Sequence, residues 1–152
     1  MRLVDEVLKY KRVSITETAK NTGKTECLNY ILRNIPSDVT VATTSIGVDG
    51  ESIDAVTNTS KPEVYLKKGM YFATSETHYR ERRITSEIIG LSTTSSSLGR
   101  YVTGKAISEG KLMLSGPSSV ADIEAWMQKT GPNAIDLFLI DGAASRLSSA
   151  TP

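Results

Sequence analysis

The sequence predicts an α/β fold of three layers, with a parallel sheet at its core and a β-rich antiparallel insertion. Two observations indicate the parallel core. Short β-branched runs, Val13–Thr16 and Val39–Ile46, stand on either side of a segment with helical spacing, and a later apolar run, Ile135–Ile140, ends in an aspartate. Nearly continuous apolar strands that alternate with helices are typical of a sheet covered on both faces. We read residues 1–152 as a single domain.

The first strand leads through a polar loop into Gly23, Lys24 and Thr25, which is the layout of a phosphate-binding P-loop. Backbone N–H groups of such a loop and the positive end of the next helix hold an anion. A glycine lets the backbone approach the phosphates, the lysine reaches the β- and γ-phosphates, and the threonine hydroxyl coordinates Mg²⁺. The residues expected to bind the nucleotide are Asn21, Thr22, Gly23, Lys24, Thr25 and Glu26.

The motif departs from the full pattern at one position. The P-loop signature has a glycine five residues before Gly23, where this chain has Thr18, preceded by Glu17. A carboxylate at the mouth of a phosphate loop weakens anion binding unless it points away. The alternative interpretation is that Lys24 and Thr25 only begin an ordinary helix.

The helix that follows is predicted to run to about Asn34, because Pro36 ends it. Its apolar face carries Cys27, Leu28, Ile31 and Leu32. Cys27 is the only cysteine, so an internal disulfide is excluded and a buried thiol is expected. A short amphipathic helix is predicted before the first strand from Leu3, Val4, Val7 and Leu8.

Two carboxylates, Asp49 and Glu51, follow the strand that ends at Ile46. The carboxyl ends of parallel strands line the edge where open α/β sheets bind ligands. We therefore expect both side chains to contact Mg²⁺ or to position a water molecule. The alternative is a solvated acidic turn.

Residues 54–114 are read as the β-rich insertion or extension of the sheet. Two hairpins are predicted, one joining Val64–Leu66 to Met70–Ala73 and one joining Tyr101–Ile107 to Lys111–Leu114. A further strand is expected over Ile84–Leu91, followed by a loop over Ser92–Ser97. This part is expected to recognise something other than the nucleotide.

The basic run His78–Arg83 is interpreted as a solvated face, with contact to phosphate or to an acidic partner as the alternative. His78 has no second histidine, cysteine or aspartate at ligand spacing, which argues against a metal site. A helix is predicted to begin at Ser118 or Ser119 and to end at Gly131, with Trp126 in an apolar stripe that we interpret as core.

The apolar strand that ends in Asp141 has the form of a Walker B segment. A strand beside the P-loop strand would deliver Asp141 close to the Mg²⁺ that Thr25 holds. The catalytic residues expected from the sequence are Lys24, Asp49, Glu51 and Asp141, and the expected metal ligands are Thr25 and Asp141. No motif in the sequence separates ATP from GTP.

Composition limits the other possibilities. The 152 residues suffice for a domain with its own core, and 18 basic against 17 acidic residues imply no general attraction to nucleic acid or membranes. The sequence has no apolar run of membrane-spanning length, and its acidic N-terminus is unlike a signal peptide, so a cytoplasmic location is expected. Because the chain stops just after the strand with Asp141, we expect a sheet that is truncated there and completed in a longer protein or by a partner, in a homo- or hetero-oligomer.

Several segments together resemble the P-loop subunit of the lysine 5,6-aminomutase reactivase family. They are LVDEVLKYKRVSIT, AKNTGKTECLNYIL, TSIGVDGE, TNTSKPEVYLKKGMYFATSE, LSGPSS and IDLFLIDGAASR, and the similarity runs from Val4 to Arg146. The resemblance implies an ATPase that works with a related subunit to reactivate a cobalamin-dependent aminomutase. It also implies that Gly23, Lys24 and Thr25 bind nucleotide and Mg²⁺, with Asp141 as the acidic partner. In that family a glycine stands at the position of Glu17 or Thr18, which bears on hydrolysis more than on binding. The alternatives are a module that binds nucleotide without hydrolysing it and a small-molecule kinase.

Overall fold

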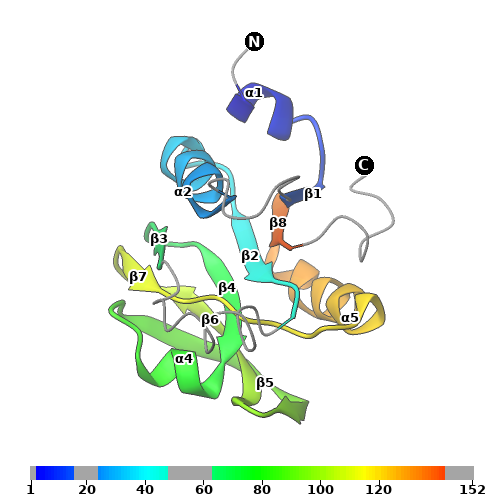
Figure 1. Ribbon diagram of the computed structural model, residues 1–152. Helices are drawn as coiled ribbons and strands as arrows, with labels where there is room; N and C mark the ends of the chain where they lie inside the picture. Colours follow the sequence, from blue (N-terminus) through cyan, green and yellow to red (C-terminus); the bar gives the residue numbers. More distant parts are fainter. Residues whose placement is uncertain (1–2, 16–23, 48–62, 143–152) are drawn as a thin grey trace.

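The computed structural model describes residues 3–15, 24–47 and 63–142. Within these ranges one mixed sheet has the strand order β1-β8-β2-β4-β6-β5, and β3 and β7 form a separate two-stranded ribbon (Figure 1). The strands are β1 Arg12–Ile15, β2 Val41–Ser45, β3 Val64–Leu66, β4 Tyr71–Ser75, β5 Ser86–Ser96, β6 Gly99–Ala106, β7 Gly110–Leu112 and β8 Leu137–Asp141. The helices are α1 Leu3–Val7, α2 Lys24–Asn34, α4 Glu76–Arg80 and α5 Val120–Thr130, and a 3₁₀ turn, Gly131–Asn133, follows α5.

The core of the sheet is parallel. Strand β8 lies between β1 and β2 and is parallel to both, and β4 continues the parallel arrangement beside β2. On the far side of β4, strands β6 and β5 add antiparallel pairs. The predicted α/β class with a mainly parallel central sheet is therefore confirmed.

Alternation along β8 shows how both faces of the sheet are buried. Leu137 and Leu139 pack in one apolar cluster with α1 and α2, whereas Phe138 and Ile140 pack in a second cluster with α5. Successive side chains of a strand point to opposite faces, so a strand covered on both sides is apolar at every position. Figure 1 shows α1 and α2 on one side of this part of the sheet and α5 on the other.

The predictions for the β-rich part are correct only in outline. Both predicted hairpins are wrong, because β3 pairs with β7 in an antiparallel ribbon while β4 pairs with β2 and β6. The predicted loop Ser92–Ser97 is also wrong, since β5 continues through it to Ser96. Antiparallel extension of the central sheet is confirmed for β6 and β5.

Helix ends follow local signals. Helix α2 ends at Asn34 and α5 ends just before Gly131, as predicted. The Ser119 hydroxyl accepts a hydrogen bond of 3.1 Å from the backbone N–H of Asp122, which caps α5. The short helix α4 was not predicted, and it is capped by Ser75, whose hydroxyl accepts a bond of 3.3 Å from the N–H of His78.

One ion pair joins the first strand to α5. Both terminal nitrogens of Arg12 donate to Glu124, over 2.7 and 2.6 Å, and each side chain is about one third exposed. The hydrogen bond from Arg12 lowers the pKa of Glu124, and burial opposes this shift. The charged pair therefore stabilises the folded chain above the ordinary pKa of a glutamate, and this contribution is lost as the pH falls through the lowered pKa of Glu124.

We expect Glu124→Gln to reduce the acid sensitivity of the fold. The free energy of unfolding should fall more for the wild type than for the variant between neutral pH and pH values of about 3, by less than about 1 kcal/mol since the pair is partly solvated. Urea denaturation at a series of pH values measures the difference. Arg12→Gln should flatten the profile in the same way, and parallel profiles for all three proteins would contradict the prediction.

Candidate functional site at the carboxyl edge of the parallel strands

Three parallel strands end together at one edge of the sheet. Asp141, the last residue of β8, is in register with Ile15 at the end of β1 and with Ser45 at the end of β2. The backbone continues this alignment, because the N–H of Ile46 donates to the carbonyl of Asp141 over 2.6 Å and the N–H of Gly142 donates to Ile15 over 3.0 Å. The predicted adjacency of the first strand, β1, and the strand ending in Asp141 is confirmed.

Asp141 is a carboxylate held inside this edge. The residue is only 4% exposed. Burial raises the pKa of the Cys27 thiol, and the negative charge of Asp141 raises it further. Cys27 lies in the first turn of α2, so the charge of Asp141 acts on the start of the helix that begins at Lys24.

Close packing fixes the residue after Asp141. A Cβ atom on Gly142 would lie 1.8 Å from Cγ2 of Ile46 and 3.0 Å from its Cβ. Only glycine fits there, and this lets the ends of β8 and β2 approach each other. Gly142 was not among the predicted site residues, although a glycine directly after a buried strand is a usable signal of close approach.

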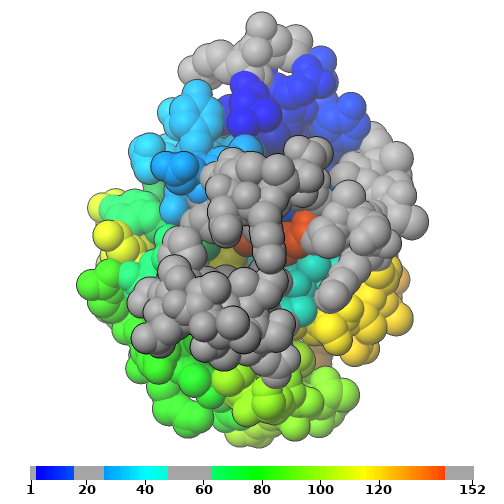
Figure 2. Space-filling view, in the orientation of Figure 1, coloured from blue at the N-terminus to red at the C-terminus, as the bar shows by residue number. Residues whose placement is uncertain are grey.

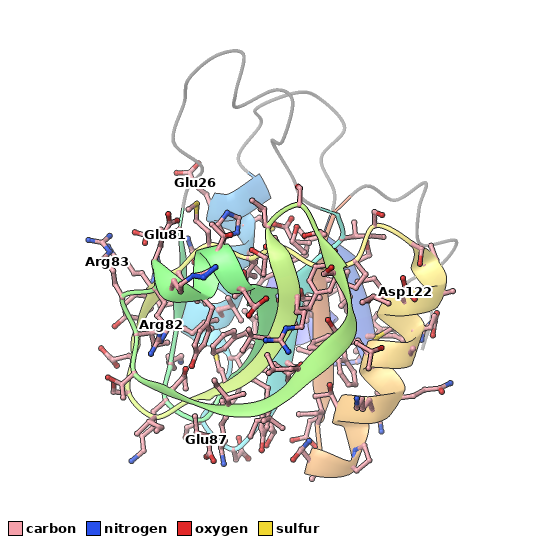
Figure 3. The ribbon with its side chains drawn as sticks, turned by 90° about the horizontal axis from the view of Figure 1, so that it is seen from below. Glu26, Glu81, Arg82, Arg83, Glu87 and Asp122 are labelled. Atoms are coloured by element: carbon pink, nitrogen blue, oxygen red, sulfur yellow. The ribbon has the colours of Figure 1, made fainter. Side chains whose placement is uncertain are left out.

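The structure places only part of the predicted site. The backbone of Lys24 and Thr25 begins α2, and Glu26 is exposed on its first turn (Figure 3). Asp141 lies at the end of β8, as described above. The other predicted site residues, which are Asn21, Thr22, Gly23, Asp49 and Glu51, lie outside the described residues, as do Glu17 and Thr18 of the incomplete motif.

The donor set at this edge suits a hard cation. Mg²⁺ in nucleotide sites takes oxygen ligands, with one or two protein carboxylates or hydroxyls beside phosphate oxygens and water. Asp141 offers a buried carboxylate. Thr25 is the second residue of α2, and Cys27 follows it in the same first turn. Asp141 and Thr25 would hold the ion.

A second polar cluster lies at the end of β4, next to β2. Nδ1 of His78 and Oγ of Ser115 are 2.9 Å apart, and the hydroxyl of Ser115 also accepts the N–H of Ser75 over 3.0 Å. The N–H of Ser115 donates to Thr74 over 3.2 Å. In the sequence, His78 was considered as part of a basic run and as a metal ligand, and this contact was not predicted because His78 and Ser115 are 37 positions apart.

The loop after Ser115 connects this polar cluster to the sheet edge at which Asp141 lies. The N–H of Gly47 donates to the carbonyl of Pro117 over 2.8 Å, and the N–H of Gly116 donates back to Gly47 over 3.2 Å. A Cβ atom on Gly116 would lie 2.3 Å from the carbonyl oxygen of Ser45. The imidazole of His78 is thereby tied to the same sheet edge as Asp141, two strands away.

The basic run His78–Arg83 is only partly a solvated face. Arg80 and Arg83 are exposed, and Arg83 pairs with Glu63. Arg82 instead lies over the ring of Tyr79, with its guanidinium carbon 4.1 Å from the ring centroid. Figure 3 shows Glu81, Arg82 and Arg83 together on the side of the molecule opposite α5.

Among the described residues, no helix has the length and apolar character that a membrane span requires. Comparisons of this chain with models of protein families, with curated proteins and with solved structures found no match.

Proposed function

We propose that this chain is a P-loop nucleotide-binding subunit that binds and hydrolyses ATP, with GTP as the less favoured nucleotide. The observation that carries the proposal is the position of Asp141. It is a buried carboxylate at the carboxyl end of the strand beside β1, and its charge acts on the first turn of α2. This position supports the role of a Walker B aspartate, which holds Mg²⁺ together with the P-loop threonine.

The roles of the residues follow from the charge of the substrate. The backbone N–H groups from Asn21 to Glu26 would hold the phosphates at the helix N-terminus, and Lys24 would place a positive charge on the β- and γ-phosphates. Mg²⁺, when bound, neutralises charge that develops on the phosphate oxygens. Asp49 and Glu51 are proposed to orient the attacking water or to assist in holding the metal.

The proposed partner is a related subunit, and the proposed target is a cobalamin-dependent aminomutase. This part of the proposal rests on the sequence resemblance. The nucleotide state would change how the β-rich part grips the target, since loops that contact the γ-phosphate relax after hydrolysis. Equal binding of the target enzyme in ATP and in ADP would overturn it.

Thermal unfolding with Mg-ATP and with Mg-GTP tests nucleotide binding directly. A ligand at one hundred times its dissociation constant stabilises the folded state by about 2.7 kcal/mol, which is a shift of several degrees in a domain of this size. We expect this shift in the wild type and its loss in Lys24→Ala, which removes the phosphate-binding charge. No shift with either nucleotide would overturn the proposal for this chain.

A measurement of phosphate release distinguishes an ATPase from a protein that only binds the nucleotide. If the nucleotide stabilises the protein but no phosphate is released, the chain is a binding module, which is the outcome favoured by Glu17 and Thr18 in place of the usual glycine. Turnover of ATP to ADP only in the presence of an added small alcohol or amine, with the phosphoryl group transferred to that acceptor, would instead identify a kinase.

A further inference from the structure

A hollow of about 340 Å³ lies between α5 and the antiparallel part of the sheet. It is on the α5 face, whereas α1 and α2 cover the other face. In Figure 2, α5 (yellow) and the strands β5 and β6 (light green) adjoin at the lower right of the molecule. The volume is within the range of small-molecule sites, which are clefts of about 300 to 1,000 Å³.

The floor of the hollow is a row of small residues. Ala73 of β4, Thr103 of β6 and Gly90 of β5 are paired across three neighbouring strands, and all three line the hollow. A Cβ atom added to Gly90 would meet nothing within 4 Å. Since side chains at paired positions share a face, this row leaves a flat surface on which a ring can lie.

One wall is the indole of Trp126, which is fixed in place. Its ring packs edge-on against Phe138 at a centroid distance of 5.7 Å, and its Nε1 donates to the hydroxyl of Thr103 over 3.0 Å. The single donor of the indole is thus occupied, so the wall offers only an apolar ring surface. Sequence analysis placed Trp126 in the core stripe of α5. The structure shows that only part of the ring packs there, and the side chain is half-buried.

Polar groups are placed to orient a bound ring. Thr103 accepts from Trp126, and among the described residues its own O–H has no acceptor, so it can donate to a ring nitrogen or a carbonyl above the floor. Asp122 and Lys129 stand at the two ends of the same face of α5, seven residues and about 10 Å apart, with Trp126 between them. Figure 3 shows Asp122 on α5, beside the ribbon of β5 and β6.

We propose that this hollow is a binding site for a planar heteroaromatic molecule that carries a hydrogen-bond acceptor. The ring lies over Ala73 and Gly90 and against Trp126, with the acceptor at its edge on the hydroxyl of Thr103. Aromatic walls and one well-placed donor are the typical composition of such sites. Asp141 does not line this hollow, and the proposal does not depend on nucleotide binding.

The chain has a built-in reporter, because Trp126 is its only tryptophan. Its indole N–H gives one resolved proton–nitrogen correlation in the NMR spectrum of the full chain. We expect nicotinamide, a planar ring with acceptors, to shift this signal saturably, with a dissociation constant at least tenfold lower than that of cyclohexanecarboxamide. The second compound has the same amide on a non-planar ring. Equal affinity for both compounds, or no saturable shift, would overturn the proposal.

Two substitutions test the geometry. Gly90→Leu places a side chain in the hollow and should weaken binding at least tenfold, whereas Ile88→Ala on the opposite face of β5 should leave it unchanged. Thr103→Val should also weaken binding about tenfold, and Thr103→Ser should restore it. Unchanged binding in Thr103→Val, or the same loss in Ile88→Ala as in Gly90→Leu, would contradict the site. If Gly90→Leu does not fold, the threonine pair gives the result by itself.

Discussion

Asp141→Asn is expected to lower Mg²⁺-dependent phosphate release by about 100-fold or more, equivalent to about 2.7 kcal/mol in the barrier. The amide has the shape of the carboxylate, so the packing at the end of β8 is retained. Only the negative charge that would hold the cation is lost. Release of inorganic phosphate from ATP, measured with wild type and variant at saturating Mg²⁺, gives the ratio.

The same substitution has a second readout that needs no nucleotide. The charge of Asp141 raises the pKa of Cys27, so its removal should lower that pKa and increase the fraction of thiolate at mildly alkaline pH. Alkylation of the single cysteine should then be faster in the variant at the same pH. Asp38→Asn, an exposed aspartate before the start of β2, is the matched control and should change neither quantity.

The two readouts separate two kinds of failure. Faster alkylation with unchanged hydrolysis would leave the geometry of the edge intact and contradict the role of Asp141 in catalysis. Unchanged alkylation would contradict the position of Asp141 beside α2, which is the basis of the proposed function.

The parallel core was predictable because its signals are local. Strand β8 is apolar at every position until Asp141, and α2 and α5 have apolar faces at helical spacing with ordinary ends. Each of these elements can therefore be recognised from a few neighbouring residues. The adjacency of β1 and β8 followed from the motifs rather than from the strands themselves, and the place of β2 on the other side of β8 was not predicted.

The antiparallel part was not predictable for a physical reason. Strand β5 is mostly exposed, rich in serine and threonine, and interrupted by register shifts, so it lacks the alternation that identifies a half-buried strand. The ribbon of β3 and β7 joins residues more than 40 positions apart, between Val64 and Leu112. Such pairing depends on tertiary contacts that no local pattern contains.

The candidate site also contains one residue that was predictable from local sequence and several contacts that were not. Asp141 was predictable because an acidic residue that ends an apolar strand is a local pattern. The contact of His78 with Ser115 and the pairing of Gly90 with Ala73 through Thr103 arise only when distant strands meet. In each case the residue types are unremarkable, and only the fold gives them a common location.

Phe72→Ala is expected to have the largest effect on stability, a loss of about 3 to 5 kcal/mol in the free energy of unfolding. The side chain is fully buried and its ring stacks with Tyr79 at a centroid distance of 6.3 Å. The ring also fills the space above a glycine, because a Cβ atom on Gly104 would lie 2.6 Å from its Cζ. Denaturation in guanidinium chloride measures the loss.

Gly104→Ala tests this arrangement from the other strand. In the wild type the added methyl group collides with a buried ring and should cost about 1 to 3 kcal/mol. In Phe72→Ala the same methyl group enters the cavity left by the ring, so its cost should fall to zero or become a gain. The two substitutions share one space and are therefore expected to be strongly non-additive. Additive losses would mean that β4 and β6 do not meet at these residues, and the register that places Thr103 opposite Ala73 would be wrong as well.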